Sequence, residues 1–219
     1  MTRTGEEGWV LRRQIVAAAQ RLDAQGLMPG PSGNLSARLD EERVLVVPSG
    51  VPKAALQPEE LLVVTLGGEV VGGIKGMKPT SELPMHLEVY HRRPDVAAVV
   101  HAHPAASVAL TLVGISLEEP VLPEAVLLLG EVPTTTYATP STAENQDAIA
   151  EWIGTHDVIL LARHGALTVG RTVTEAVVRM EVLEHTARTL LWAYLVGKPS
   201  PLPQDAVAKL WEVRRHYGR

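Results

Sequence analysis

Two histidines, His101 and His103, are spaced to bind one metal ion together. They stand at the end of Val96–Val100, an apolar run between Pro94 and Pro104 that indicates a buried strand. Side chains two residues apart on an extended chain leave it on the same face, so both imidazoles can converge on one point. Imidazole is a common zinc ligand. Two ligands do not complete a site, however, and histidines that only form hydrogen bonds at a strand end explain this pattern equally well.

A third histidine favours a metal site over histidines that only form hydrogen bonds. The apolar run Asp157–Leu161 predicts another strand, and it leads directly into Arg163-His164-Gly165. Three histidines at strand ends, with one position open for water, a carboxylate or a substrate, match the coordination of a catalytic zinc ion rather than a structural one. Glu82 is the candidate for the fourth group. An acidic residue at a helix start also has a simpler explanation, because it interacts favourably with the helix dipole.

Three short segments of small and hydroxyl-bearing residues are candidates to bind an anion. Pro29–Ser36 contains two glycines and breaks every periodicity, Pro48-Ser49-Gly50 follows a predicted strand, and Thr80-Ser81 stands where a helix begins. Backbone N–H groups in such turns, and those at a helix N-terminus, can bind phosphate. Because no cluster of lysines is visible, we expect hydroxyls and N–H groups alone to form the cradle. Taken singly, each segment is more often an ordinary turn.

Apolar residues at helical spacing predict the helices that carry these segments. One helix can be capped by Thr80 or Ser81, and it ends before Pro94. A capping box is expected at Ser141–Glu144. The other predicted helices are Trp9–Gln25, Pro104–Leu112, Thr172–Val196 and Asp205–His216. Four further histidines are interpreted as structural or surface residues and placed outside the site: His86, His91, His156 and His185.

Apolar and β-branched runs predict the remaining strands. Leu61–Thr65 and Glu69–Val71, joined by two glycines, indicate a hairpin. Further strands are expected at Arg43–Val47, Val132–Tyr137 and Ala166–Gly170, whereas Val121–Leu129 is apolar and fits neither pattern. Periodicity alone therefore predicts an α/β protein.

Composition excludes several classes of protein. The chain contains no cysteine, which rules out disulfides, iron–sulfur clusters and thiolate zinc sites. Its formal net charge of −5, with dispersed basic residues, argues against a general nucleic-acid binder. No apolar run approaches about 18 residues and no signal peptide is visible, so we expect a cytoplasmic protein without membrane contact. At 219 residues, a single domain over residues 1–219 is expected.

Six motifs in order resemble the class II aldolase and adducin family, and within it the L-fuculose-1-phosphate aldolases. They are Ser32-Gly33-Asn34-Leu35-Ser36, Pro48-Ser49-Gly50, Lys78-Pro79-Thr80-Ser81-Glu82, His101-Ala102-His103-Pro104, Tyr137-Ala138-Thr139-Pro140 and Arg163-His164-Gly165. The resemblance implies a three-layer α/β/α architecture with a central mixed, mainly antiparallel sheet. It also implies a homotetramer with active sites at subunit interfaces.

The resemblance also implies a role for each site residue. The metal ligands would be His101, His103 and His164 with Glu82, which hold one Zn²⁺ per chain, and Glu82 would be the acid/base carboxylate. The substrate phosphate would be bound by Gly33, Asn34, Ser49, Gly50, Thr80 and Ser81. Tyr217, followed by Gly218, matches a catalytic tyrosine near the chain end. A second aldolase tyrosine aligns with Glu124, so the chain departs from the pattern there.

These expectations combine into one leading function. A zinc-dependent aldolase would reversibly cleave a sugar 1-phosphate of the L-fuculose type into dihydroxyacetone phosphate and a small aldehyde such as L-lactaldehyde. Glu82 would move the proton, and we expect its pKa to be raised by a dry, partly apolar site or by release from the metal. The alternatives are a related phosphoketose enzyme, such as L-ribulose-5-phosphate 4-epimerase or a sugar-phosphate dehydratase, and a non-enzymatic adducin-like binding module.

Overall fold

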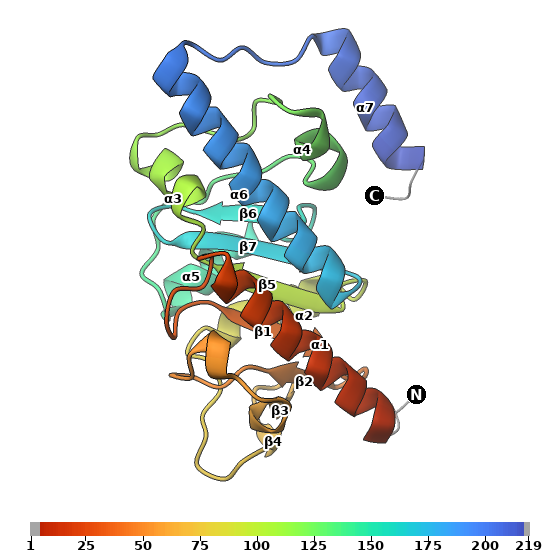
Figure 1. Ribbon diagram of the computed structural model, residues 1–219. Coiled ribbons are helices and arrows are strands. Elements are labelled where there is room, and N and C mark those ends of the chain that lie inside the picture. Colours follow the sequence, from red (N-terminus) through yellow and green to blue (C-terminus); the bar gives the residue numbers. More distant parts are fainter. Residues whose placement is uncertain (1–4, 217–219) are drawn as a thin grey trace.

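The computed structural model describes residues 5–216 and is built on one seven-stranded sheet (Figure 1). The strand order is β4-β3-β2-β1-β5-β7-β6, and each neighbouring pair is antiparallel. The strands are β1 Asn34–Arg38, β2 Arg43–Val46, β3 Leu62–Thr65, β4 Val70–Gly72, β5 Ala98–Ala102, β6 Val158–Leu161 and β7 Gly165–Gly170. The prediction of a mainly antiparallel sheet is therefore confirmed, and among the described strands every pair is antiparallel rather than mixed.

Helices cover both faces of this sheet. They are α1 Gly5–Ala24, α2 Leu83–Arg92, α3 Ala105–Leu112, α4 Pro123–Leu128, α5 Ala143–Ala150, α6 Val173–Val196 and α7 Gln204–His216. Two short 3₁₀ helices, η1 Lys53–Ala55 and η2 Pro58–Glu60, lie between β2 and β3. In the part of the chain that the structure describes, no helix has both the length and the apolar character needed to traverse a bilayer.

Side chains that point alternately to the two faces of the sheet divide the apolar residues into two cores. Val100 and Leu160 pack with residues of α1, α3 and α6, whereas Val99 and Ile159 pack with residues of α2 and α5. Side chains of a strand point alternately to opposite faces, so each central strand contributes to both cores. The result is the predicted α/β/α arrangement, with α1 and α6 lying across one face of the sheet in Figure 1.

The predicted strand Val132–Tyr137 is wrong. This segment forms a single isolated bridge, in which Thr134 lies beside Leu160 in a parallel sense. The Thr135 N–H donates to the Leu160 carbonyl at 2.9 Å, and the Leu160 N–H donates to the Pro133 carbonyl at 2.9 Å. A run of threonines shows β-propensity but does not specify a pairing partner. Here the run only covers the outer edge of β6 before the chain turns away.

The predicted helix caps also differ from the structure. Glu82 itself is the N-cap of α2, and the Thr80 hydroxyl accepts a hydrogen bond from the Glu82 N–H at 3.3 Å. At α5 the N-cap is Thr142, without a side-chain cap bond, and the Glu144 carboxylate instead accepts from the Thr139 N–H at 3.0 Å. The segment Val121–Leu129, which fitted no pattern, contains α4.

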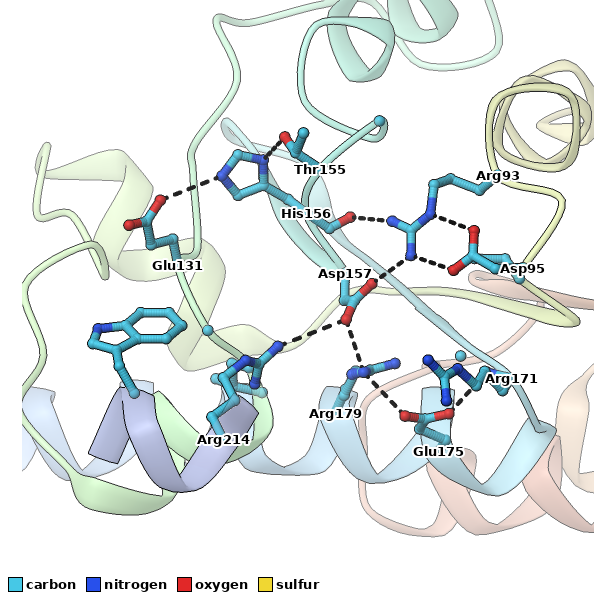
Figure 2. A pocket seen from close by; sticks show the side chains of 16 residues that line it. Arg93, Asp95, Glu131, Thr155, His156, Asp157, Arg171, Glu175, Arg179 and Arg214 are labelled. Carbon is cyan, nitrogen blue, oxygen red and sulfur yellow. Dashed lines mark hydrogen bonds and ion pairs between the residues drawn. The ribbon is translucent and has the colours of Figure 1, made fainter. Parts of the chain in front are cut away.

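An ion-pair network around Asp157 joins the elements at one end of the sheet (Figure 2). The Asp157 carboxylate, just before β6, accepts hydrogen bonds from Arg93 at 2.9 Å and from Arg179 of α6 at 2.8 Å. Arg214 of α7 lies 3.7 Å from the same carboxylate and donates to the Leu127 carbonyl of α4 at 2.7 Å. One acidic residue thus helps to fix α4, α6, α7 and the start of β6.

The same network lines a cavity of about 690 Å³. Around the cavity, Asp95 pairs with Arg93 and Glu175 pairs with Arg179, so the charged side chains that line it largely pair with one another. The cavity lies at the start of β5 and β6, whereas the candidate site lies at the other end of these strands. None of the described residues that the sequence assigns to the site lines it.

Asp157→Asn should lower the free energy of unfolding by about 2–4 kcal/mol, because it leaves two largely buried guanidinium groups without their shared carboxylate. The measurement is urea-induced unfolding of the full chain. Asp205→Asn is the matched control, since its pair with Lys209 spans 3.7 Å with both side chains more than three-quarters exposed. Equal midpoints for the two variants would contradict a structural role for Asp157.

Candidate metal centre

The sheet register brings the site residues to one edge of the fold. Asn34, at the start of β1, is the cross-strand partner of His101 near the end of β5. On the other side of β5, His101 pairs with Leu167 of β7. His164 lies in the tight turn between β6 and β7, where Arg163 adopts a positive φ of 61°. The N-terminus of α2 adds Glu82 to the same place.

The four side chains offer ligand atoms that all lie within 4.8 Å of one another. Nε2 of His101 is 3.0 Å from Nε2 of His103 and 3.1 Å from a carboxylate oxygen of Glu82. The second carboxylate oxygen is 3.5 Å from Nε2 of His164. Three imidazole nitrogens and one carboxylate oxygen form a donor set typical of zinc and related divalent ions.

Two further observations fit a cation at this point. Nδ1 of His101 lies 3.0 Å from the carbonyl oxygen of Ala166, which can only accept, so Nδ1 carries a proton and Nε2 is the nitrogen that faces the other candidate ligands. Oε1 of Glu82 is buried and has no hydrogen-bond donor in the described structure. A buried carboxylate oxygen without a donor is costly, and a metal ion among the four groups would satisfy it.

Burial sets the protonation of the candidate ligands. It lowers the pKa of His103 and of His164 to about 4, with a further contribution from the charge of His101. Both imidazoles are therefore neutral near pH 7, as metal coordination requires. Burial alone would raise the pKa of Glu82, but the hydrogen bond and charge of His101, together with the Asn34 amide, lower it below its ordinary value. The expectation that this pKa is raised is therefore wrong.

Gly165 allows the close packing behind the histidines. A Cβ atom at this position would overlap the carbonyl oxygen of Ala102 and would lie 3.0 Å from Cε1 of His101 and 3.1 Å from Cδ2 of His103. The first of these contacts is shorter than real Cβ atoms show, and the other two are unusually tight. The glycine is needed for the approach of β7 to β5, and any larger residue would push against two of the candidate ligands.

A chain of buried hydrogen bonds runs from Glu82 into the α2 side of the core. Nδ2 of Asn34 donates to Glu82 at 2.9 Å, which turns the Asn34 carbonyl oxygen toward Nε2 of His86 at 2.5 Å. His86 Nε2 must then carry the proton, so Nδ1 accepts from the Ser36 hydroxyl at 2.6 Å. The Tyr90 hydroxyl lies 2.8 Å from Ser36 and completes the chain as a donor.

His86 is a structural residue outside the candidate ligands, as the sequence interpretation has it, but its link to Glu82 through Asn34 is not anticipated there. It is fully buried, and burial lowers its pKa to about 3, so it acts as a neutral hydrogen-bonding group. Two sequence signals point to it: His86 follows Glu82 by four positions on one helix face, and Ser36 follows Asn34 by two on one strand face. Asn34 has a second role besides the expected one, because its amide orients Glu82.

The predicted phosphate-binding residues surround a cavity of about 230 Å³ beside the four candidate ligands. Glu82, His103 and His164 also line it, which places the anion segments next to the metal site. Lys53 and Ser141 line the same cavity and were not predicted; the Ser141 hydroxyl lies 2.9 Å from that of Ser81. The expected segments contribute Gly33, Asn34, Ser49, Gly50, Thr80 and Ser81. Tyr217 lies outside the described residues.

Comparison with known proteins gives a consistent answer. Residues 13–191 match the model of the family described as "Class II Aldolase and Adducin N-terminal domain". The chain is 31% identical over 210 residues to a 5-deoxy-D-ribulose 1-phosphate aldolase of Bacillus thuringiensis, covering 95% of this chain and 97% of that protein. It is 32% identical to a 3-oxo-tetronate 4-phosphate decarboxylase of Pectobacterium atrosepticum, covering 91% of each.

Similarity to L-fuculose phosphate aldolases is found in both sequence and structure. The protein from Methanococcus vannielii is 38% identical over 120 residues, and the match spans 55% of this chain and 65% of that protein. The crystal structure of L-fuculose-1-phosphate aldolase from Thermus thermophilus superposes with a TM-score of 0.74 at 34% identity, covering 84% of this chain and 94% of that one.

Gly165→Ala should weaken metal binding about 10- to 100-fold while all four candidate ligands are retained, because the added methyl group displaces His101 and His103. Affinity is measured by chelator competition on the folded, metal-loaded chain. His164→Ala is the reference for loss of a ligand. Gly154→Ala is the matched control, since nothing lies within 4 Å of a Cβ there. Wild-type affinity in Gly165→Ala would show that this packing does not shape the site.

Proposed function

The chain belongs to the class II aldolase and adducin N-terminal domain family, and on that premise we propose that it is a metal-dependent lyase acting on sugar phosphates. The reaction we favour is the reversible cleavage of a ketose 1-phosphate of the L-fuculose type into dihydroxyacetone phosphate and a small aldehyde such as L-lactaldehyde. The observation that carries this proposal is the convergence of three histidines and Glu82 beside the cavity that the phosphate-binding segments surround.

His101, His103 and His164 would hold one Zn²⁺ per chain, with Glu82 as the fourth group. The bound ion would polarise the carbonyl and hydroxyl oxygens of the ketose and stabilise the negative charge that develops there. The protein's own contribution is to keep His103 and His164 neutral through burial and to orient His101 through its hydrogen bond to the Ala166 carbonyl.

Glu82 would move the proton. In the direction of synthesis, its carboxylate takes a proton from the hydroxymethyl carbon of dihydroxyacetone phosphate, and that carbon then attacks the aldehyde. In cleavage, the same carboxyl group returns the proton to that carbon. A lowered pKa keeps Glu82 ionised at neutral pH, so the base is present before the substrate binds. The Asn34 amide, held by His86, fixes the direction of the carboxylate.

A decarboxylase is the second candidate, and similarity over 91% of both chains to a 3-oxo-tetronate 4-phosphate decarboxylase favours it. Loss of carbon dioxide from a 3-oxo acid also leaves negative charge beside a carbonyl group, and the carbon is then protonated. The same cation and the same Glu82 would serve both reactions. A panel of ketose phosphates and 3-oxo-acid phosphates, assayed for dihydroxyacetone phosphate and for carbon dioxide, separates the two.

An epimerase, a dehydratase or a binding module fits the site less well. The first two share only the fold and the metal site with the proposed lyase, and the epimerases of this family usually have Asp in place of Glu82. An adducin-like binding module would not need three histidines and a carboxylate within 4.8 Å of one another. Metal analysis of the purified protein distinguishes a binding module from an enzyme.

We also propose that residues 1–219 act as one domain within a cytoplasmic homotetramer, as the resemblance implies. Large apolar side chains at the end of α6 support an assembly, because Trp192, Leu195 and Val196 are each more than half exposed. Tyr217 would serve the oxygen of the aldehyde from the chain end that follows α7. Glu124 stands where the resemblance expects a tyrosine, and it lies 3.8 Å from His185. Because the tyrosine is replaced, the aldehyde partner can differ from lactaldehyde.

Glu82→Gln tests the proton step directly. The variant should remain folded and lose about 10²–10⁴-fold in the rate at which dihydroxyacetone phosphate exchanges its hydroxymethyl proton with solvent. This assay needs no knowledge of the aldehyde. Glu88→Gln, on the same helix, is the matched control and should exchange at the wild-type rate. Wild-type exchange in a metal-loaded Glu82→Gln variant would show that the base lies elsewhere.

Ser49→Ala tests the phosphate site. Loss of a hydrogen bond to a charged group should raise KM for dihydroxyacetone phosphate about 10-fold or more, with little change for unphosphorylated dihydroxyacetone. Both values come from the same proton-exchange assay. Ser200→Ala, at an exposed position after α6, is the control. An equal effect on both ketoses would mean that Ser49 does not contact the phosphate.

A further inference from the structure

Lys53 is a fully buried lysine next to the candidate active site. Its side chain is 1% exposed, and it is the largest of the fully buried side chains. The residue begins η1, and its ammonium group donates to the Pro31 carbonyl at 3.0 Å and to the Val51 carbonyl at 3.2 Å. An ammonium group has three N–H donors, so one of them is left for another acceptor.

The charge of Lys53 lacks a partner of opposite sign in the part of the chain that the structure describes. Among the side chains that the structure describes, no carboxylate lies within ion-pair distance of its ammonium group, and Asp23 acts on it only as a more distant charge. Burial accordingly lowers the pKa of Lys53. Lysines are seldom fully buried without a counter-charge, because desolvation of an ammonium group is costly. The position is thus prepared for an anion that comes from outside the chain.

The surroundings of Lys53 show where that anion would bind. Lys53 lines the cavity of about 230 Å³ together with Ser49, Gly50, Thr80 and Ser81. The Pro31 carbonyl belongs to the segment Pro29–Ser36 that is expected to contact phosphate, and the Val51 carbonyl directly follows the expected segment Pro48-Ser49-Gly50. Among the described residues, no other lysine and no arginine lines this cavity.

We propose that Lys53 is the cation that recognises the phosphate group of the substrate. This inference rests on the proposed function in taking the substrate to be a phosphate monoester. The ammonium group would fix the two loops through their carbonyl oxygens and direct its remaining N–H toward the phosphate. The expectation that hydroxyls and backbone N–H groups form the cradle alone is then incomplete, since one buried lysine supplies the charge that a surface cluster would otherwise provide.

Lys53→Gln separates this charge from a purely structural role, because the Gln amide still offers two N–H donors to the loop carbonyls. The probe is inorganic phosphate, titrated by calorimetry into the full-length, metal-loaded chain. We expect the affinity for phosphate to fall about 10- to 100-fold in Lys53→Gln and in Lys53→Met. Lys75→Gln makes the same change in net charge at an exposed position and should bind phosphate like the wild type.

Unchanged phosphate affinity in a folded Lys53→Gln variant overturns the inference, as does a wild-type protein that binds no phosphate. Should the Lys53 variants not fold, the four exposed lysines can be replaced by arginine to leave Lys53 as the one lysine signal in ¹³C NMR: Lys75, Lys78, Lys198 and Lys209. Phosphate must then shift the Lys53 signal, and a constant signal overturns the inference. Wild-type protein that binds phosphate without cleaving any sugar phosphate would refute the proposed reaction and leave the role of Lys53 standing.

Discussion

The hydrogen bond between Nδ1 of His101 and the Ala166 carbonyl is the interaction on which the site depends. It fixes the tautomer of a fully buried imidazole and aims its second nitrogen at His103 and Glu82. The bond exists only in this sheet register, where Ala166 lies opposite Ala102. A shift by one residue would turn His101 to the other face of the sheet. The candidate metal centre is therefore a consequence of strand pairing as much as of residue type.

The rest of the fold holds that register in place from both ends of the strands. At the start of β6, Asp157 joins the strand to α6 and α7 through arginines, while its far end leads into the turn that carries His164. On the α2 side, the chain of hydrogen bonds from Tyr90 to Asn34 pairs the polar side chains that the core buries there and ends on Glu82. A base held by a packed helix and a strand is more precisely placed than one on a mobile loop.

Sequence alone identified the parts of this site that local patterns encode. The two-residue spacing of His101 and His103, the apolar run before His164 and the glycine-rich turns all have a period or a composition that can be recognised. The roles of His86 and Lys53 were missed because they depend on neighbours 50 and 22 residues away. The pKa of Glu82 was predicted in the wrong direction for the same reason, since burial was anticipated and the opposing His101 and Asn34 contacts were not.

The composition of the candidate site also explains why the fold leaves the exact reaction open. Cleavage of an aldol and loss of carbon dioxide share one difficulty, which is negative charge beside a carbonyl group, and in the proposed function the three histidines with Glu82 would serve that shared step. In the proposed function the cavity next to them would bind a phosphate group, which the names of both kinds of relative include. The leaving group differs between the reactions. Of the two residues proposed to act on it, Glu124 lies on α4 and does not line this cavity, and Tyr217 is outside the described residues. Specificity is therefore expected to reside in residues outside the cluster of three histidines and Glu82, which would supply the chemistry common to these reactions.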